Sequence, residues 1–105
     1  MGNEVTPDSF GIASKLWPGL AKLGEEAAEV GQEIMKIVAT GGVMEYGDGR
    51  TLNEDKLWDE VADLLAAIEF FGECNASTER AARIVARADL KLNTYRRWRV
   101  DEAKP

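Results

Sequence analysis

The sequence predicts an all-α protein, and more narrowly a four-helix bundle-like protomer that is completed by oligomerisation. Apolar residues recur at helical spacing through most of the 105 residues. No stretch alternates polar and apolar residues as a half-buried strand does, and glycines and prolines separate the periodic segments. A single domain of residues 1–105 is expected, and because so short a chain buries a modest core, self-association would help it.

A first, short helix is expected over residues 6–16. Thr6 suits the N-cap, Pro7 the first helical position and Asp8 the first turn. Trp17 precedes Pro18, which disfavours helical backbone at Trp17 and predicts a break there.

The second helix is expected to follow this break and to run to about Ala39, where Thr40-Gly41-Gly42 ends it. At 100° per residue its side chains fall on three arcs. The apolar arc holds Leu20, Leu23, Ala27, Val30, Ile34 and Ile37; the small-residue arc holds Gly24, Ala28, Gly31 and Met35; the acidic arc holds Glu25, Glu26, Glu29 and Glu33, with Lys22 and Lys36. Neighbouring like charges weaken a helix by a few tenths of a kcal/mol per pair, so the acidic arc calls for a reason.

Residues 42–53 are predicted to form a loop that could close over a substrate, and a third helix is expected over residues 54–73. Glu60 falls inside the edge of the apolar arc of this helix, and Asp63 lies just beyond it. Burying an unpaired charge costs several kcal/mol. Glu60 is therefore expected to be protonated, paired with a base or bound to a cation.

The fourth helix is expected to begin after a cap at Asn75 or Ser77 and to end near Arg99, with residues 100–105 as a flexible tail. One flank of its apolar arc carries a basic row, defined as Arg80, Arg83, Arg87 and Lys91. Such a row either pairs with acidic neighbours or binds phosphate oxygens.

Composition removes several classes of function. The formal charge of −6 argues against binding to a nucleic acid polymer. No apolar run could span a membrane and no signal segment is evident, so a cytoplasmic protein is expected. The absence of histidine removes imidazole zinc sites and His-activated nucleophiles, and a single cysteine, Cys74, excludes an internal disulfide.

Two acidic pairs at i,i+3 on successive long helices could face one another. Glu26 with Glu29, and Glu60 with Asp63, would offer four oxygen ligands to one space. Such a set suits Mg²⁺, or Mn²⁺, better than zinc. The alternative is that each pair is solvated surface, as most acidic pairs on amphipathic helices are.

These residues resemble a known family. Glu25-Glu26-x-x-Glu29 followed by Glu60-x-x-Asp63 is similar to the EExxE…ExxD signature of the all-α nucleoside triphosphate pyrophosphatases, in particular the MazG-like branch. The contexts KLGEEAAEVGQEIMK and LWDEVADLLAAIEFF are similar too, and the resemblance covers residues from about 15 to 98.

The resemblance implies a four-helix protomer in a homodimer or homotetramer, and Mg²⁺-dependent hydrolysis of a (deoxy)nucleoside triphosphate to the monophosphate and pyrophosphate. By position, Glu26, Glu29, Glu60 and Asp63 would bind the metal, and Glu25 would assist as an outer ligand or water-orienting base. Lys91, with Arg87 one turn earlier, would contact phosphate. The sequence departs from the family in the longer gap between Val30 and Asp59, and in Asp89 where relatives often have Asn.

Three questions stay open at this level. The base needs an apolar or aromatic surface, and Trp17, beside the helix break, is the preferred candidate over Phe10 and Trp58. Glu33 has no part in the signature and is either an outer-shell or a solvated residue. The alternative function is a non-catalytic helical interaction protein whose acidic cluster binds a structural cation or a partner.

Overall fold

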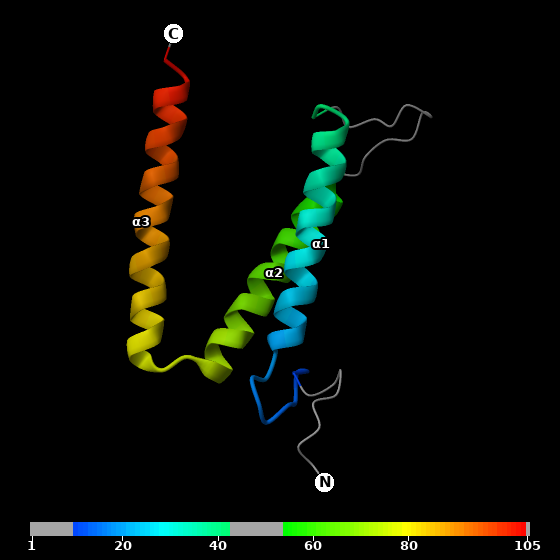
Figure 1. Cartoon of the computed structure of the whole chain (residues 1–105), viewed down its shortest axis with the longest axis vertical. Coiled ribbons are helices and arrows are strands. Elements are labelled where there is room, and N and C mark those ends of the chain that lie inside the picture. Colours follow the sequence, from blue (N-terminus) through cyan, green and yellow to red (C-terminus); the bar gives the residue numbers. More distant parts are fainter. Residues whose placement is uncertain (1–9, 43–53, 105) are drawn as a thin grey trace. The chain divides into compact units, whose positions relative to one another are not determined.

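The computed structural model describes residues 10–42 and 54–104, and these contain three helices (Figure 1). They are α1 (Leu20–Ala39), α2 (Glu54–Asn75) and α3 (Thr78–Glu102). No strand occurs in the described ranges. The all-α prediction is confirmed, whereas a four-helix bundle is not confirmed.

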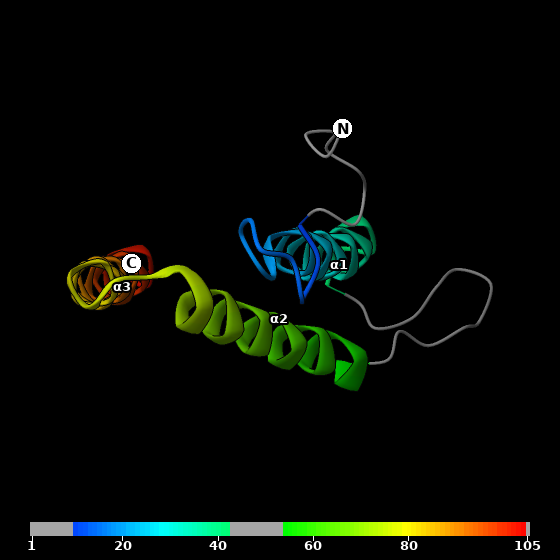
Figure 2. The ribbon, with the colours of Figure 1, turned by 90° about the horizontal axis from the view of Figure 1, so that it is seen from below.

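The chain divides into two compact units, residues 1–75 and residues 76–105. In the first unit α1 and α2 run antiparallel and lie side by side, as Figures 1 and 2 both show. The second unit contains α3. That residues 1–105 form one domain stays a prediction.

The first predicted helix is wrong over residues 10–16, which form turns and bends; residues 6–9 lie outside the described part of the chain. The hydroxyl of Ser14 accepts from the amide of Leu16 at 3.1 Å and donates to the Leu16 carbonyl at 2.9 Å, so it competes with helical backbone bonding. The segment instead turns back over the start of α1. The carbonyls of Gly11 and Phe10 accept from the amides of Gly19 and Ala21, each at 3.0 Å.

These backbone bonds replace a side-chain cap at the start of α1, where Gly19 is the N-cap residue and offers no side chain. The predicted break at Trp17 is confirmed, because α1 begins at Leu20. Trp17 has a φ of 52°, a left-handed conformation that costs a non-glycine residue about 1–2 kcal/mol. Its indole stacks on Phe71, with ring centroids 5.9 Å apart and an interplanar angle of 11°.

The predicted glycine termination of α1 is confirmed in detail. The amide of Gly41 donates to Val38 at 3.0 Å and that of Gly42 donates to Ile37 at 2.9 Å, the two bonds of a Schellman motif. The φ angles of Gly41 and Gly42 are 67° and 84°. Residues 43–53, most of the predicted loop, lie outside the described residues.

Between α2 and α3 the cap is Ser77, one of the two predicted residues, whose hydroxyl accepts from the amide of Arg80 at 3.0 Å. Asn75 acts differently: its amide donates at 2.9 Å to the carbonyls of Phe71 and Pro18, and so fixes the end of α2 to the segment before α1. α3 continues to Glu102, so residues 100–102 of the predicted tail are helical.

Little apolar surface is buried among the described residues. Ala67 is the buried apolar residue, Glu33 is the buried charged residue, and α3 has no buried residue. Several side chains of the predicted apolar arcs are exposed, among them Ile34, Leu65, Ile68, Val85 and Leu92. None of the helices in the described part is both long and apolar enough to cross a bilayer.

Candidate metal centre

Three of the four predicted metal ligands come together in the structure. Glu26 on α1 and Glu60 and Asp63 on α2 each offer a carboxylate oxygen, and these oxygens lie within 4.8 Å of one another. They meet because α1 and α2 lie side by side, while the i,i+3 spacing puts Glu60 and Asp63 on neighbouring turns of one face. The predicted pairing of the two acidic segments across two helices is therefore present.

The residues fit a hard divalent cation. One oxygen of Glu26 and one of Glu60, Oε2 in each case, are buried without a hydrogen-bond partner. A buried acceptor without a partner costs about 1–3 kcal/mol, more if it is charged. A cation with several oxygen ligands would supply the missing partner to both carboxylates.

The pKa values of these carboxyls reflect the same crowding. Partial burial raises the pKa of Glu26, and the negative charges of Glu29 and Asp63 raise it further. The pKa of Glu60 is raised first by its hydrogen bond with Glu29, then by burial and by the charges of Glu29, Asp63 and Glu26. Without a cation the cluster therefore tends to hold a proton, and a cation would take the place of that proton.

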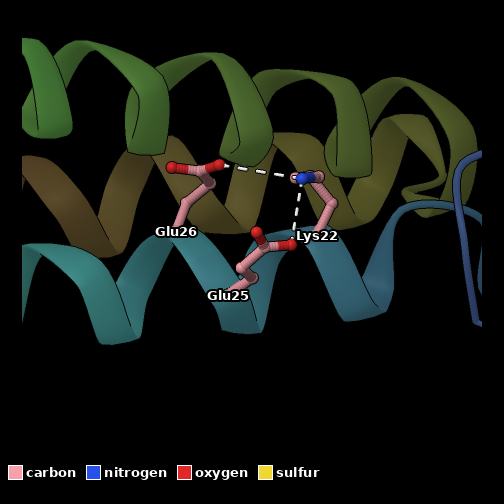
Figure 3. A network of polar contacts seen from close by, with 3 residues as sticks. All are labelled: Lys22, Glu25 and Glu26. Atoms are coloured by element: carbon pink, nitrogen blue, oxygen red, sulfur yellow. Dashed lines mark hydrogen bonds and ion pairs between the residues drawn. The ribbon is translucent and has the colours of Figure 1, made fainter. Parts of the chain in front are cut away.

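Glu29, the fourth predicted ligand, lies beside Glu60 as its hydrogen-bond partner but outside the group of three converging oxygens. Glu25 is also outside that group. Its side chain is 54% exposed and pairs with Lys22, whose Nζ is 2.9 Å from Oε2 of Glu25 and 3.9 Å from Oε1 of Glu26. Figure 3 shows Lys22 and Glu26 reaching from α1 toward α2, while Glu25 stays beside α1.

Glu33, whose role was open, is buried and joins the two helices. Its Oε1 lies 3.2 Å from Nζ of Lys36 on α1 and 3.3 Å from Nζ of Lys56 on α2. Burial by itself would raise the pKa of Glu33, but the hydrogen bonds and charges of the two lysines outweigh it, and the net direction is downward. Glu33 is thus an ionised, paired carboxylate rather than a solvated one.

A hollow of about 410 Å³ adjoins the carboxylate cluster of Glu26, Glu60 and Asp63 in the first unit. Its lining residues are Ile12, Gly19, Lys22, Glu26, Asp63, Ala66, Ala67 and Phe70. Trp17, the predicted surface for a base, is not one of them; its indole is half exposed and lies against Phe71.

The predicted phosphate ligands lie on α3, in the second unit. Arg87 and Lys91 share one face of α3 with Ile84 and Ala88, along a shallow hollow of about 520 Å³. Their approach to the carboxylates of α1 and α2 stays a prediction.

Sequence reasoning missed three residues of this region. Phe70 follows Asp63 by two helical turns, and this i+7 spacing could have placed it on the same face. Gly19 follows Pro18 just before a helix, and this pair of residues predicts only a turn. Lys56 carries no signal, because its partner Glu33 lies on another helix, 23 residues earlier in the chain.

Searches of known protein families, of curated proteins and of solved structures find no match to this chain.

Proposed function

We propose that the protein is a nucleotide pyrophosphohydrolase that uses Mg²⁺, or Mn²⁺, to hydrolyse (deoxy)nucleoside triphosphates to the monophosphate and pyrophosphate. The observation that carries the proposal is the convergence of Glu26, Glu60 and Asp63, with one buried and unpartnered oxygen on each glutamate. The resemblance to the EExxE…ExxD signature adds the reaction class. A role in clearing unwanted nucleotides would follow from that chemistry.

In this proposal Glu26, Glu60 and Asp63 would hold the cation, with Glu29, which lies beside Glu60, as a fourth ligand. When bound, the cation neutralises charge on the phosphate oxygens and lowers the pKa of a nearby water. The chemistry needs little more from the protein than positioning and fixed charge.

The remaining predicted residues take the following roles. Water attacks the α-phosphorus, the bond to the bridging oxygen breaks, and pyrophosphate leaves. Glu25, which Lys22 holds beside Glu26, accepts the proton of the attacking water. Arg87 and Lys91 bind the triphosphate, and Trp17 stays a candidate surface for the base.

We further propose that the working form is a homodimer or homotetramer. The exposed fractions of Ile84, Val85 and Trp98 on α3 are 51%, 60% and 54%. A row of exposed apolar side chains on a helix with no buried residue favours a protein partner. A second copy fits by charge, because residues 76–105 carry eight basic and four acidic side chains and residues 1–75 carry five basic and fifteen acidic ones.

The direct test is release of pyrophosphate from a panel of the common ribo- and deoxyribonucleoside triphosphates in the presence of Mg²⁺. Glu60→Gln keeps the shape of the side chain and removes its charge, so we expect a loss of activity of at least about 100-fold. Glu69→Gln is the matched control, since Glu69 is exposed on the same helix. Unchanged activity in Glu60→Gln would show that the assignment of the site is wrong.

The second candidate is a helical interaction protein without catalysis, and the exposed apolar face of α3 is the observation that favours it. Calorimetry separates the two. Binding of Mg²⁺ or Mn²⁺ that requires Glu60 and is strengthened by nucleotide supports the enzyme. Absence of both effects supports the interaction protein.

A further inference from the structure

The hollow beside the carboxylate cluster has two chemically different ends. Glu26 and Asp63 line it where it meets the cluster, whereas Ile12 and Phe70 make the other end apolar and partly aromatic. Phe70 lies seven residues after Asp63 on α2, two turns or about 10 Å along the axis. A ligand that spans both ends would carry a charged group at one end and a flat apolar group at the other.

The ring of Phe70 is held in place by the backbone at Gly19. A Cβ atom at Gly19 would lie 2.9 Å from Cδ1 and 3.0 Å from Cε1 of Phe70, closer than side chains tolerate. Gly19 is itself buried and has a φ of 86°, so glycine is favoured there for two reasons. The close approach restricts the ring on the side that faces Gly19, and such restriction before a ligand binds reduces the entropy lost on binding.

Trp17, the aromatic side chain that the sequence favours as a surface for the base, already has a ring partner. Trp17 stacks on Phe71 and does not line the hollow, so a flat ligand in the hollow meets Phe70 first. Ala66 and Ala67 carry small side chains and lie between Asp63 and Phe70 on the wall of the hollow. They leave room along α2 between the carboxylate end and the ring.

We propose that this hollow binds the base of a nucleotide, stacked on Phe70, while the phosphates extend toward Glu26 and Asp63. The proposal rests on the proposed function for the identity of the ligand. It differs from the sequence-based prediction by assigning the stacking surface to Phe70 in place of Trp17. Stacking of a base on an aromatic side chain tolerates every base, so this contact sets affinity rather than base preference.

The test measures binding in the presence of Mg²⁺ by calorimetry, with two probes: a nucleoside monophosphate and inorganic pyrophosphate. Phe70→Leu removes the ring but stays apolar, and we expect it to weaken binding of the monophosphate by about 5- to 150-fold while leaving pyrophosphate binding unchanged. Phe70→Tyr keeps a ring and should restore affinity. Trp17→Leu tests the competing stacking surface, and we expect it to weaken binding of the monophosphate less than Phe70→Leu does.

Several results would overturn the proposal: equal weakening of both probes in Phe70→Leu, no weakening of either, no binding of the monophosphate by the wild type, or a loss that follows Trp17→Leu instead. Gly19→Ala provides a second route to the same answer, because it displaces the Phe70 ring without changing it. We expect it to weaken the monophosphate selectively. If Gly19→Ala does not fold, Phe70→Leu still decides.

The proposed function and this inference fail separately. A wild type that releases no pyrophosphate yet binds the monophosphate through Phe70 refutes the enzyme and supports the base site. A wild type that releases pyrophosphate, and whose KM is unchanged in Phe70→Leu, refutes the base site alone.

Discussion

The α1–α2 pair and α3 differ in both charge and burial. Residues 1–75 carry a formal charge of −10 and residues 76–105 carry +4. In the first unit, carboxylates such as Glu33 and Glu26 are largely withdrawn from water, with 11% and 13% of their side chains exposed. On α3 the apolar residues Val85 and Leu90 are 60% and 56% exposed.

The first unit therefore withdraws charged groups from water, whereas α3 has no buried residue; exposed apolar side chains occur on both. Buried carboxylates are retained where they have a cation or a base beside them, as Glu33 has with Lys36 and Lys56. Exposed apolar rows are retained where a partner covers them. We therefore propose that α1 and α2 hold the metal and the base, that Arg87 and Lys91 of α3 bind phosphate, and that the apolar side chains of α3 mediate assembly. The following changes test that division.

The largest effect is expected from a charge placed on the apolar face of α3. Ala88 lies on that face beside Ile84, and Ala88→Glu should convert the oligomer to a monomer, because withdrawing a carboxylate from water costs several kcal/mol even when Arg87 and Lys91 lie near it. The matched control is Ala86→Glu, because Ala86 lies two residues earlier and about 160° away around the helix. Light scattering coupled to size-exclusion chromatography gives the masses. A wild type that is already monomeric, or equal masses for all three proteins, would contradict the role of α3.

The next largest effect is expected from pH and Mg²⁺ on the free energy of unfolding, through the carboxylates of the first unit. The pKa values of Glu26 and Glu60 are raised above 4.5, so the folded chain holds protons that the unfolded chain has released. Without a divalent cation, the free energy of unfolding should therefore fall as the pH rises from about 4.5 through the raised pKa values. Added Mg²⁺ should reduce this fall and raise the Tm by several degrees near pH 8.

Circular dichroism at a series of pH values, with Mg²⁺ or with a chelator, checks this expectation. Glu60→Gln should give a flatter dependence on pH in chelator and little response to Mg²⁺, whereas Glu69→Gln should behave as the wild type. If the free energy of unfolding depends on pH in the same way with Mg²⁺ and with chelator, the carboxylate cluster does not bind Mg²⁺.

A smaller effect is expected at the opposite end of the α1–α2 pair. Glu33→Gln removes the ion pairs with Lys36 and Lys56, whose side chains are 38% and 52% exposed, so a loss of only about 1 kcal/mol is expected. The pKa of Glu33 is lowered, so its contribution is complete above the unfolded value of 4.5 and disappears as the pH falls through the folded value.

Urea unfolding at neutral and at acid pH measures this difference, with Glu69→Gln as the control. The gap between wild type and Glu33→Gln should close at acid pH, below the window in which Glu26 and Glu60 act. If the difference in the free energy of unfolding stays constant with pH, the loss in Glu33→Gln comes from packing and not from charge.

These cases show how much the sequence could predict. Local signals predicted the break at Trp17, the end of α1 at Ala39 with its glycine termination, and Ser77 as one of two candidate caps, because each depends on neighbours in the chain. The spacing of Glu26, Glu60 and Asp63 gave the carboxylate cluster, because helical period alone decides which residues share a face.

The misses depended on contacts distant in sequence. Thr6-Pro7-Asp8 reads as a helix start, yet the residues after it bond to the beginning of α1, a possibility that no local signal reveals. That Phe70 lines the hollow could not be predicted either, because the ring packs against Gly19, which lies 51 residues away in the chain. Glu33 could not be assigned because Lys56 reaches it from α2.

The smallest effect on stability is expected from a substitution on the small-residue arc of α1. This substitution also tests whether α1 takes part in assembly. A Cβ atom at Gly24 would meet no other atom within 4 Å in the described chain, and Gly24 is exposed in the interior of a helix. If assembly uses α3, Gly24→Ala should increase the free energy of unfolding by about 0.5–1 kcal/mol, because alanine loses less backbone entropy. Urea unfolding and mass measurement together decide the matter. A loss of stability with a change in mass would mean that the backbone of a second copy packs on Gly24, and the assembly surface would then extend from α3 to the small-residue arc of α1.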